Sequence, residues 1–170
     1  MATKDLPRLL RQWRDAEMRW AQTPVDDEAQ GDLRRSVVEA WREYNSAAGT
    51  FGEDEIVLLA DDTMTYVSVF GPTERVLGWS NEALVGRPIA AVTPPDSMEL
   101  MASEWSAFTS RGELEGQYPL LARDGSRVMT HFRARAHQPL PGTHLSRHWV
   151  LAEPDGSQAS PRAEAQPVGR

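Results

Sequence analysis

The stretch RDGSRVMTHFRARAH, residues 123–137, constrains the fold more than any other part of this sequence. An Asp-Gly pair between two β-rich runs is a strong signal for a hairpin turn. Beyond the turn, uncharged side chains occupy the even positions from Val128 to Ala134, whereas His131 and Arg133 fall at odd positions. This period of two predicts a β-strand that pairs with the preceding run and turns one face toward a core.

The flanking sequence supplies the other elements of such a sheet. β-rich runs cover residues 55–62, 64–70, 114–122 and 143–152, and helical patterns cover residues 72–78, 80–86 and 97–112. We expect the last of these helices to follow Pro94 and Pro95, with Asp96 as its N-terminal cap. The order of two strands, three helices and three strands predicts an α+β domain over residues 53–153, in which a five-stranded antiparallel sheet carries short helices on one face.

Residues 1–52 carry the period of α-helices instead. We expect a second helix to begin at Pro24, with Thr23 as its cap, and to form an antiparallel helical hairpin with the first. Two alternatives stay open: the apolar stripes pack only against each other, or they also dock on the sheet or on a second copy of the chain. The candidate residues for docking or dimerisation are Leu10, Trp13, Trp20, Val37, Trp41 and Tyr44.

Composition limits the partners and the compartment. The net charge of −7 disfavours direct contact with nucleic acid. The absence of cysteine excludes disulfides and thiolate metal sites. The sequence shows no apolar run of membrane-span length and no secretory signal pattern, so we expect a cytoplasmic protein without membrane contact. Residues 154–170 are rich in Pro, Gly, Ser and Ala, and we expect this tail to be disordered.

Reactive side chains show no catalytic or metal-binding spacing. No two of the histidines, His131, His137, His144 and His148, form a helical i, i+4 pair. We therefore expect no metal site and place all four at the surface or at sheet edges. Ser146 and His148 share a strand face, but no G-x-S-x-G motif surrounds Ser146. We expect no catalytic residues and no enzyme activity.

Two motifs resemble a known family. In ERVLGWSNEALVGRPI, residues 74–89, two short helical pieces end in glycine, and in LLARDGSRV, residues 120–128, a basic residue precedes an Asp-Gly-Ser turn. At this separation and in this element order they resemble the PAS domain, a small sensory module of bacterial signalling proteins. The chain departs from the family's pattern at Phe70 and Gly71, where many members carry Asn-Pro.

The resemblance implies a function as well as a fold. It implies a stand-alone sensory or interaction module that binds a small ligand or a partner, forms a homodimer through flanking helices, and signals in trans to a kinase or transcription regulator. We expect no cofactor, with haem or flavin as a less favoured alternative. Another alternative is a ligand-free assembly module whose core is filled by its own side chains.

A ligand cavity, in the sensory alternative, lies between the helix at residues 96–111 and the sheet. Tyr118 is the expected polar contact, because its side chain ends in a hydroxyl. The alternative is an ordinary packed core. The candidate lining residues are Leu84, Met101, Trp105, Phe108, Tyr118, Leu120 and Phe132.

Overall fold

The computed structural model of this chain describes residues 5–152, so the tail at residues 154–170 lies outside the described part. The N-terminal helices are α1 (Leu6–Gln22) and α2 (Gln30–Ala48). The strands are β1 (Glu55–Asp61), β2 (Tyr66–Phe70), β3 (Glu113–Leu121), β4 (Arg127–Arg135) and β5 (Thr143–Val150). Between β2 and β3 lie α3 (Thr73–Leu77), α4 (Asn81–Leu84), the 3₁₀ turns η1 (Ile89–Val92) and η2 (Pro95–Ser97), and α5 (Met98–Arg111).

The five strands form one antiparallel sheet in the order β2-β1-β5-β4-β3. β1 and β5 come from opposite ends of the domain yet lie side by side at its centre, where Ile56 pairs with His148. The Asp-Gly turn joins β3 to β4, and its Gly125 has a φ of 86°, which glycine adopts without strain. The predicted α+β architecture, with five antiparallel strands and an N-terminal helical hairpin, is confirmed.

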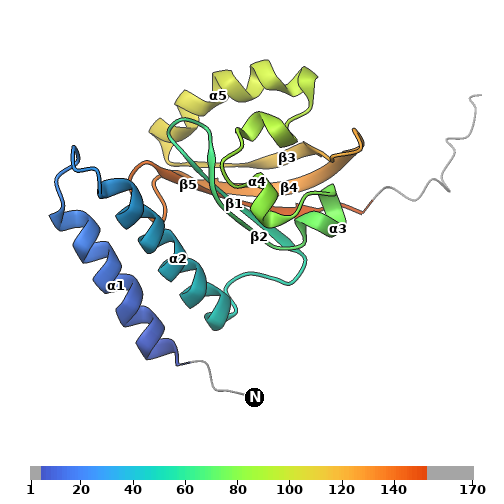
Figure 1. Cartoon of the computed structure of the whole chain (residues 1–170). Coiled ribbons are helices and arrows are strands. Elements are labelled where there is room, and N and C mark those ends of the chain that lie inside the picture. The colour runs from blue at the N-terminus through green and yellow to red at the C-terminus, as the bar shows by residue number, and fades with distance from the viewer. Residues whose placement is uncertain (1–4, 153–170) are drawn as a thin grey trace, which may run out of the picture.

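The sheet is covered on both faces. Figure 1 shows the α1–α2 hairpin on one side of it and α5 on the other. In β1, Ile56 and Leu58 pack in the layer that also holds α3 and α4, whereas Val57 and Leu59 pack toward α2. Because both of its faces are buried, β1 is a continuous apolar run rather than an alternating one. We call the face toward α5 the inner face and the face toward α2 the outer face.

The hairpin rests on the outer face of the sheet. Trp41 of α2 is only 7% exposed, and its ring lies 5.6 Å from that of Phe51 and 6.4 Å from that of Phe70. α1 packs on α2, where Ala16 and Val37 cluster with Leu140 of the β4–β5 connection. The sheet of the same chain therefore covers the apolar stripe of α2.

Two expected helix starts are wrong. α2 begins at Gln30 rather than Pro24, because Thr23 instead completes α1: its N–H bonds to the Trp20 carbonyl and its hydroxyl to the Arg19 carbonyl. The start of α5 is also later than expected. Asp96 lies in η2 and is not a cap, since its carboxylate pairs with Arg127 at 2.8 Å across to β4.

Glycine makes the turn after β2 that many PAS domains make with Asn-Pro. Gly71 has a φ of 104°, and a Cβ atom at this position would lie 2.2 Å from the Glu55 carbonyl oxygen. Any other residue would clash with the backbone at the start of β1 as well as being strained. At the position where the sequence departs from the family's pattern, the turn therefore requires glycine.

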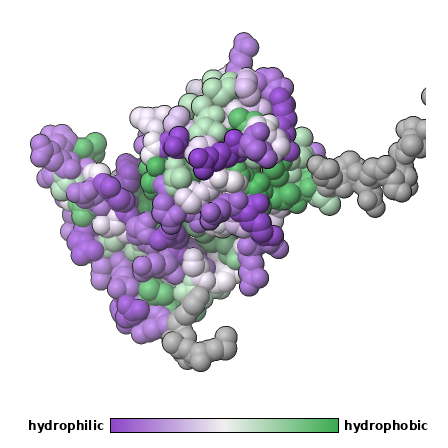
Figure 2. Space-filling model, turned by 45° about the vertical axis from the view of Figure 1, so that its right-hand side comes forward, coloured by the Kyte–Doolittle hydropathy of each residue, from purple (hydrophilic) through white to green (hydrophobic). Residues whose placement is uncertain are grey.

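The surface is mostly hydrophilic on the face that Figure 2 shows, with a hydrophobic patch beside the end of β5. Met129 and Val150 belong to the exposed hydrophobic residues, and the N–H of Leu151 bonds to the Met129 carbonyl at 2.9 Å. Within residues 5–152, no helix has the length and apolar character that crossing a membrane requires.

Candidate functional site

A cavity of about 120 Å³ lies between α5 and the inner face of the sheet. α5 contributes Met101, Trp105 and Phe108 because these positions recur on one face of the helix. The alternation of β3 and β4 turns Tyr118 and Phe132 toward the same space. The remaining lining residues are Leu58, Ala60, Tyr66, Ile89, Val92, Thr93, Glu104, Leu114, Leu120, Ala134, His144, Leu145, Ser146 and His148.

The structure brings most of the predicted cavity residues together. The exception is Leu84, which is fully buried in the core beside Leu77 and does not line the cavity. Tyr66, Thr93 and the polar residues of β5 also line the cavity, although the sequence patterns did not predict them. The signal for the last group was present in the alternation of His144, Ser146 and His148, which puts all three on one strand face. The residues that do line the cavity are Met101, Trp105, Phe108, Tyr118, Leu120 and Phe132.

Tyr118 offers the cavity a free hydroxyl. Its oxygen is buried and has no hydrogen-bond partner. The nearby Thr93 hydroxyl donates to the Ile89 carbonyl at 3.0 Å instead. Burial raises the pKa of Tyr118, which the Thr93 hydroxyl partly opposes and the charges of Glu104 and Asp96 reinforce. At neutral pH this hydroxyl is therefore protonated, and it can donate a hydrogen bond to a ligand.

A chain of directed hydrogen bonds crosses the floor of the cavity. Thr130 donates its only hydroxyl proton to the Tyr118 carbonyl at 2.8 Å, so its oxygen must accept from Nδ1 of His148, 3.0 Å away. Burial lowers the pKa of His148 to about 3, so the ring is neutral at pH 7 and carries no proton on Nε2. Nε2 is then an acceptor, and the Ser146 hydroxyl donates to it at 2.7 Å, which leaves Ser146 only acceptor lone pairs for the cavity.

Comparison with known proteins identifies the fold. No family model matches the sequence, and no curated protein matches it. Among solved structures, a PAS domain from Colwellia psychrerythraea is 18% identical, with a TM-score of 0.53, over 63% of this chain and 95% of its own. The part of this chain that aligns, 63% of its length, has the fold of a PAS domain.

Two further structures agree. The PAS domain of an HTR-like protein from Haloarcula marismortui is 17% identical, with a TM-score of 0.53, over 67% of this chain and 97% of its own. The PAS domain of the RpfR quorum-sensing receptor from Cronobacter turicensis, in complex with BDSF, is 12% identical, with a TM-score of 0.51, over 60% of this chain and 98% of its own. At these identities the similarity concerns the fold alone.

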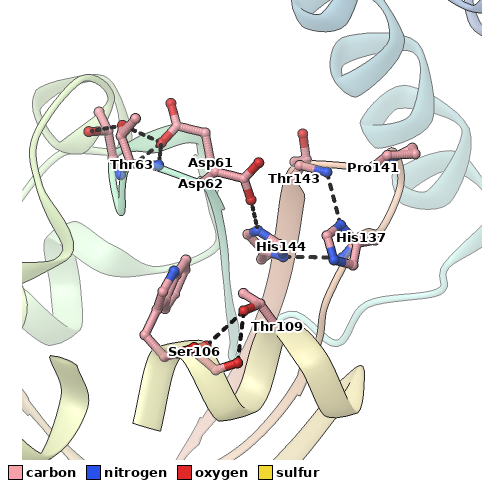
Figure 3. Close-up of polar contacts among 12 residues, drawn as sticks. Asp61, Asp62, Thr63, Ser106, Thr109, His137, Pro141, Thr143 and His144 are labelled. Atoms are coloured by element: carbon pink, nitrogen blue, oxygen red, sulfur yellow. Dashed lines mark hydrogen bonds and ion pairs between the residues drawn. The ribbon is translucent and has the colours of Figure 1, made fainter. Parts of the chain in front are cut away.

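His144 closes the end of this PAS cavity nearest the hairpin. Its Nε2 lies 2.7 Å from an Asp62 oxygen, and its Nδ1 accepts the backbone N–H of His137 at 3.1 Å. Figure 3 shows this chain of contacts from Asp62 through His144 to His137. Because Nδ1 accepts, the ring proton sits on Nε2 and points to Asp62, so neither ring nitrogen of His144 is free for a ligand.

The expectation that all four histidines lie at the surface or at sheet edges is wrong for two of them. His144 is 3% and His148 is 5% exposed, because both occupy the inner face of β5, the face that α5 covers. His144 bonds to Asp62 and to the His137 N–H, whereas His148 bonds to the hydroxyls of Thr130 and Ser146. Within residues 5–152, no group of three or more His, Asp or Glu side chains could hold a metal ion.

We expect the burial of His148 to make stability depend on pH. Burial lowers its pKa from 6.5 to about 3 in the folded state. The unfolded state therefore takes up the proton first as the pH falls, and the contribution to stability, complete above pH 6.5, is lost progressively toward pH 3. Between pH 6.5 and 4.5 this residue alone should lower the free energy of unfolding by about 2–3 kcal/mol.

Urea unfolding at a series of pH values measures this dependence, with His148→Gln as the comparison because glutamine does not titrate. The slope of unfolding free energy against pH should be flatter in the variant by about 1.4 kcal/mol per pH unit below pH 6.5. Identical slopes in the two proteins would show that His148 is not buried as a neutral ring.

Proposed function

We propose that this protein is a non-catalytic sensor that binds a small molecule in the PAS cavity and passes the signal to its helical hairpin. The observation that supports this proposal most strongly is an apolar cavity of about 120 Å³ that Tyr118 lines. The buried Tyr118 hydroxyl has no hydrogen-bond partner in the protein. Packed protein cores leave few such voids and pair nearly all buried polar groups. The structure of the RpfR PAS domain, which shares the fold, is of a complex with BDSF.

The polar residues of the cavity support binding rather than catalysis. Ser146 and His148 form the hydrogen bond that a nucleophile and its base would form. However, burial lowers the pKa of His148 to about 3, which makes it a weak base at neutral pH. Its other nitrogen is held by the hydroxyl of Thr130 rather than by a carboxylate that would stabilise a positive ring.

The β4–β5 connection, residues 136–142, is the route that we propose for the signal. At one end His144 lines the cavity and holds the connection through the His137 N–H. At the other end Leu140, only 1% exposed, packs between α1 and α2. Arg34 of α2 also donates to the Pro141 carbonyl at 2.6 Å. A ligand that favours one position of His144 would thereby favour one position of the hairpin.

Hydrogen exchange tests this route. Ligand binding should slow the exchange of amides in residues 136–142 and in α2 as well as around the cavity, because the connection links the two. A protein in which only the amides of α5 and the inner strands respond would contradict the route while leaving ligand binding intact.

The receiver of the signal is a further part of the proposal. A homodimer, or a kinase or transcription regulator bound in trans, would contact the hairpin. Val37 and Trp41 are buried within the chain, whereas Leu10, Trp13, Trp20 and Tyr44 are partly exposed and remain the candidate contact residues. Light scattering on the full chain measures the oligomeric state, and a monomer at all concentrations would exclude the homodimer.

Native mass spectrometry of the full chain, purified from its own source, tests ligand binding itself. We expect a discrete additional mass that Ala134→Leu abolishes, because the larger side chain enters the cavity. Ala102→Leu is the matched control, since Ala102 is exposed on α5. Protein without any added mass, together with an Ala134→Leu variant more stable than the parent, would favour the ligand-free assembly module.

A further inference from the structure

The geometry points to the chemical class of the ligand, an inference that rests on the proposed function. The PAS cavity is built for an uncharged, largely apolar molecule of about six to eight non-hydrogen atoms that presents one hydrogen-bond acceptor to the Tyr118 hydroxyl. A small ketone, ester or alcohol has these properties.

The size follows from the volume. An apolar cavity of roughly 150 Å³ accommodates benzene in a protein interior, and this cavity measures about 120 Å³. Its walls are mostly aliphatic and aromatic side chains, among them Trp105, Phe108 and Phe132. Such walls favour a compact apolar body over an extended polar one.

The absence of charge follows from the lining. None of the described residues that line the cavity is Lys or Arg. Nδ1 of His144 accepts a backbone N–H, and burial keeps the ring of His148 neutral, so neither histidine offers a positive charge. Glu104 lines the cavity but is exposed to solvent, so it does not provide a buried counter-charge. An anion or a cation in the interior would therefore be buried without a partner, which is strongly unfavourable.

The acceptor follows from the polar groups that remain free. The protons of Ser146, His148 and Thr130 are all committed to one another or to the Tyr118 carbonyl. The Tyr118 hydroxyl is the buried donor without a partner. Tyr66 lines the same cavity. Burial raises the pKa of its hydroxyl, and the nearby Tyr118 raises it further. Both phenols thus stay neutral, and a ligand oxygen would satisfy the buried Tyr118 hydroxyl, which has no hydrogen-bond partner.

Four probes on one ring separate these properties. Cyclohexanone is uncharged with an acceptor, methylcyclohexane is uncharged without one, cyclohexanecarboxylate is an anion, and cyclohexylammonium is a cation at pH 7. Each is titrated into the ¹⁵N-labelled full chain and followed by amide chemical shifts. We expect cyclohexanone to bind most tightly, methylcyclohexane about five- to tenfold more weakly, and neither ion to shift the cavity resonances.

Tyr118→Phe isolates the hydrogen bond. It should weaken cyclohexanone about five- to tenfold and leave methylcyclohexane unchanged. Tyr44→Phe, a half-buried tyrosine of α2 outside the cavity, is the control and should change neither. If Tyr118→Phe fails to fold, the comparison of cyclohexanone with methylcyclohexane on the parent keeps the test open, because only the ketone can accept from the Tyr118 hydroxyl.

The outcomes distinguish this inference from the proposed function. Binding of the carboxylate or the ammonium as tight as that of cyclohexanone would overturn the ligand class while supporting a ligand cavity. Equal binding of cyclohexanone by the parent and by Tyr118→Phe would overturn the role of the hydroxyl. If no probe binds and Ala134→Leu is more stable than the parent, both the ligand class and the proposed function fail.

Discussion

Trp41→Ala should lower the free energy of unfolding by about 3–5 kcal/mol, the range for removing a large buried aromatic side chain. Trp41 is the main contact of the hairpin with the outer face of the sheet. Its ring packs on Phe51 and Phe70, and the same cluster holds Val57 and Leu59 of the central strand β1. The alanine variant would leave a cavity between α2 and the sheet. Neither α2 nor the central strand β1 can move far enough to fill it, because both are packed on their other sides.

Urea denaturation followed by circular dichroism measures this loss. Met18→Ala, a 58% exposed position on α1, is the control and should change the free energy of unfolding by less than about 0.5 kcal/mol. An effect of Trp41→Ala as small as that of the control would mean that the hairpin does not rest on the sheet in solution, and the proposed route from cavity to hairpin would fall with it.

Arg147→Met should cost about 3 kcal/mol, for an electrostatic reason. The side chain of Glu55 is 2% exposed, and Arg147 holds it with two nitrogens, Nε on Oε1 and Nη2 on Oε2 at 3.1 Å. The N–H of Gly52 completes the carboxylate's partners at 2.9 Å. Methionine keeps an apolar side chain of similar length but loses the guanidinium contacts with the rings of Phe51 and Trp149, which add to the cost of the buried carboxylate left without its counter-ion.

Chemical denaturation of four variants, Arg147→Met, Arg133→Met, Glu55→Leu and the double variant of Arg147→Met with Glu55→Leu, separates the buried pair from an exposed one. Arg133→Met breaks a surface pair with Glu115, at 62% and 53% exposure, and should cost less than about 0.5 kcal/mol. Adding Glu55→Leu to Arg147→Met removes the stranded charge and should recover part of the lost stability. A double variant as unstable as the sum of its two single variants would show that the two side chains are not coupled.

The sequence predicted those features well that depend on the backbone conformation of a few neighbouring residues. The Asp-Gly turn needs a residue that tolerates a positive φ, and Gly125 adopts it. The glycine after α3 does the same, since Gly78 has a φ of 72° and bonds to the Glu74 carbonyl. Helix starts were less predictable, because Thr23 and Asp96 can each serve several roles. Competing partners, the α1 carbonyls for Thr23 and Arg127 for Asp96, decided which role they took.

The cavity could be predicted only in part. Periodicity placed Trp105 and Phe108 on one helix face and Phe132 on one strand face, and all three line the cavity. Leu84 follows the same apolar pattern but packs in the core, because α4 lies over another part of the sheet. No pattern in the sequence distinguishes a residue that fills space from one that borders a void. That difference depends on how α5 sits over the sheet.

β5 shows most clearly what the sequence determined and what only the tertiary structure decided. The alternation in THLSRHWV determined that His144, Ser146 and His148 share one face and that Leu145, Arg147 and Trp149 share the other. It could not determine that the polar face is the one beneath α5. The hairpin covers the outer face, where Leu145 clusters with Trp41, so His144 and His148 are the β5 side chains buried on the inner face. Strand period follows from the backbone alone, whereas burial depends on which distant segments cover each face.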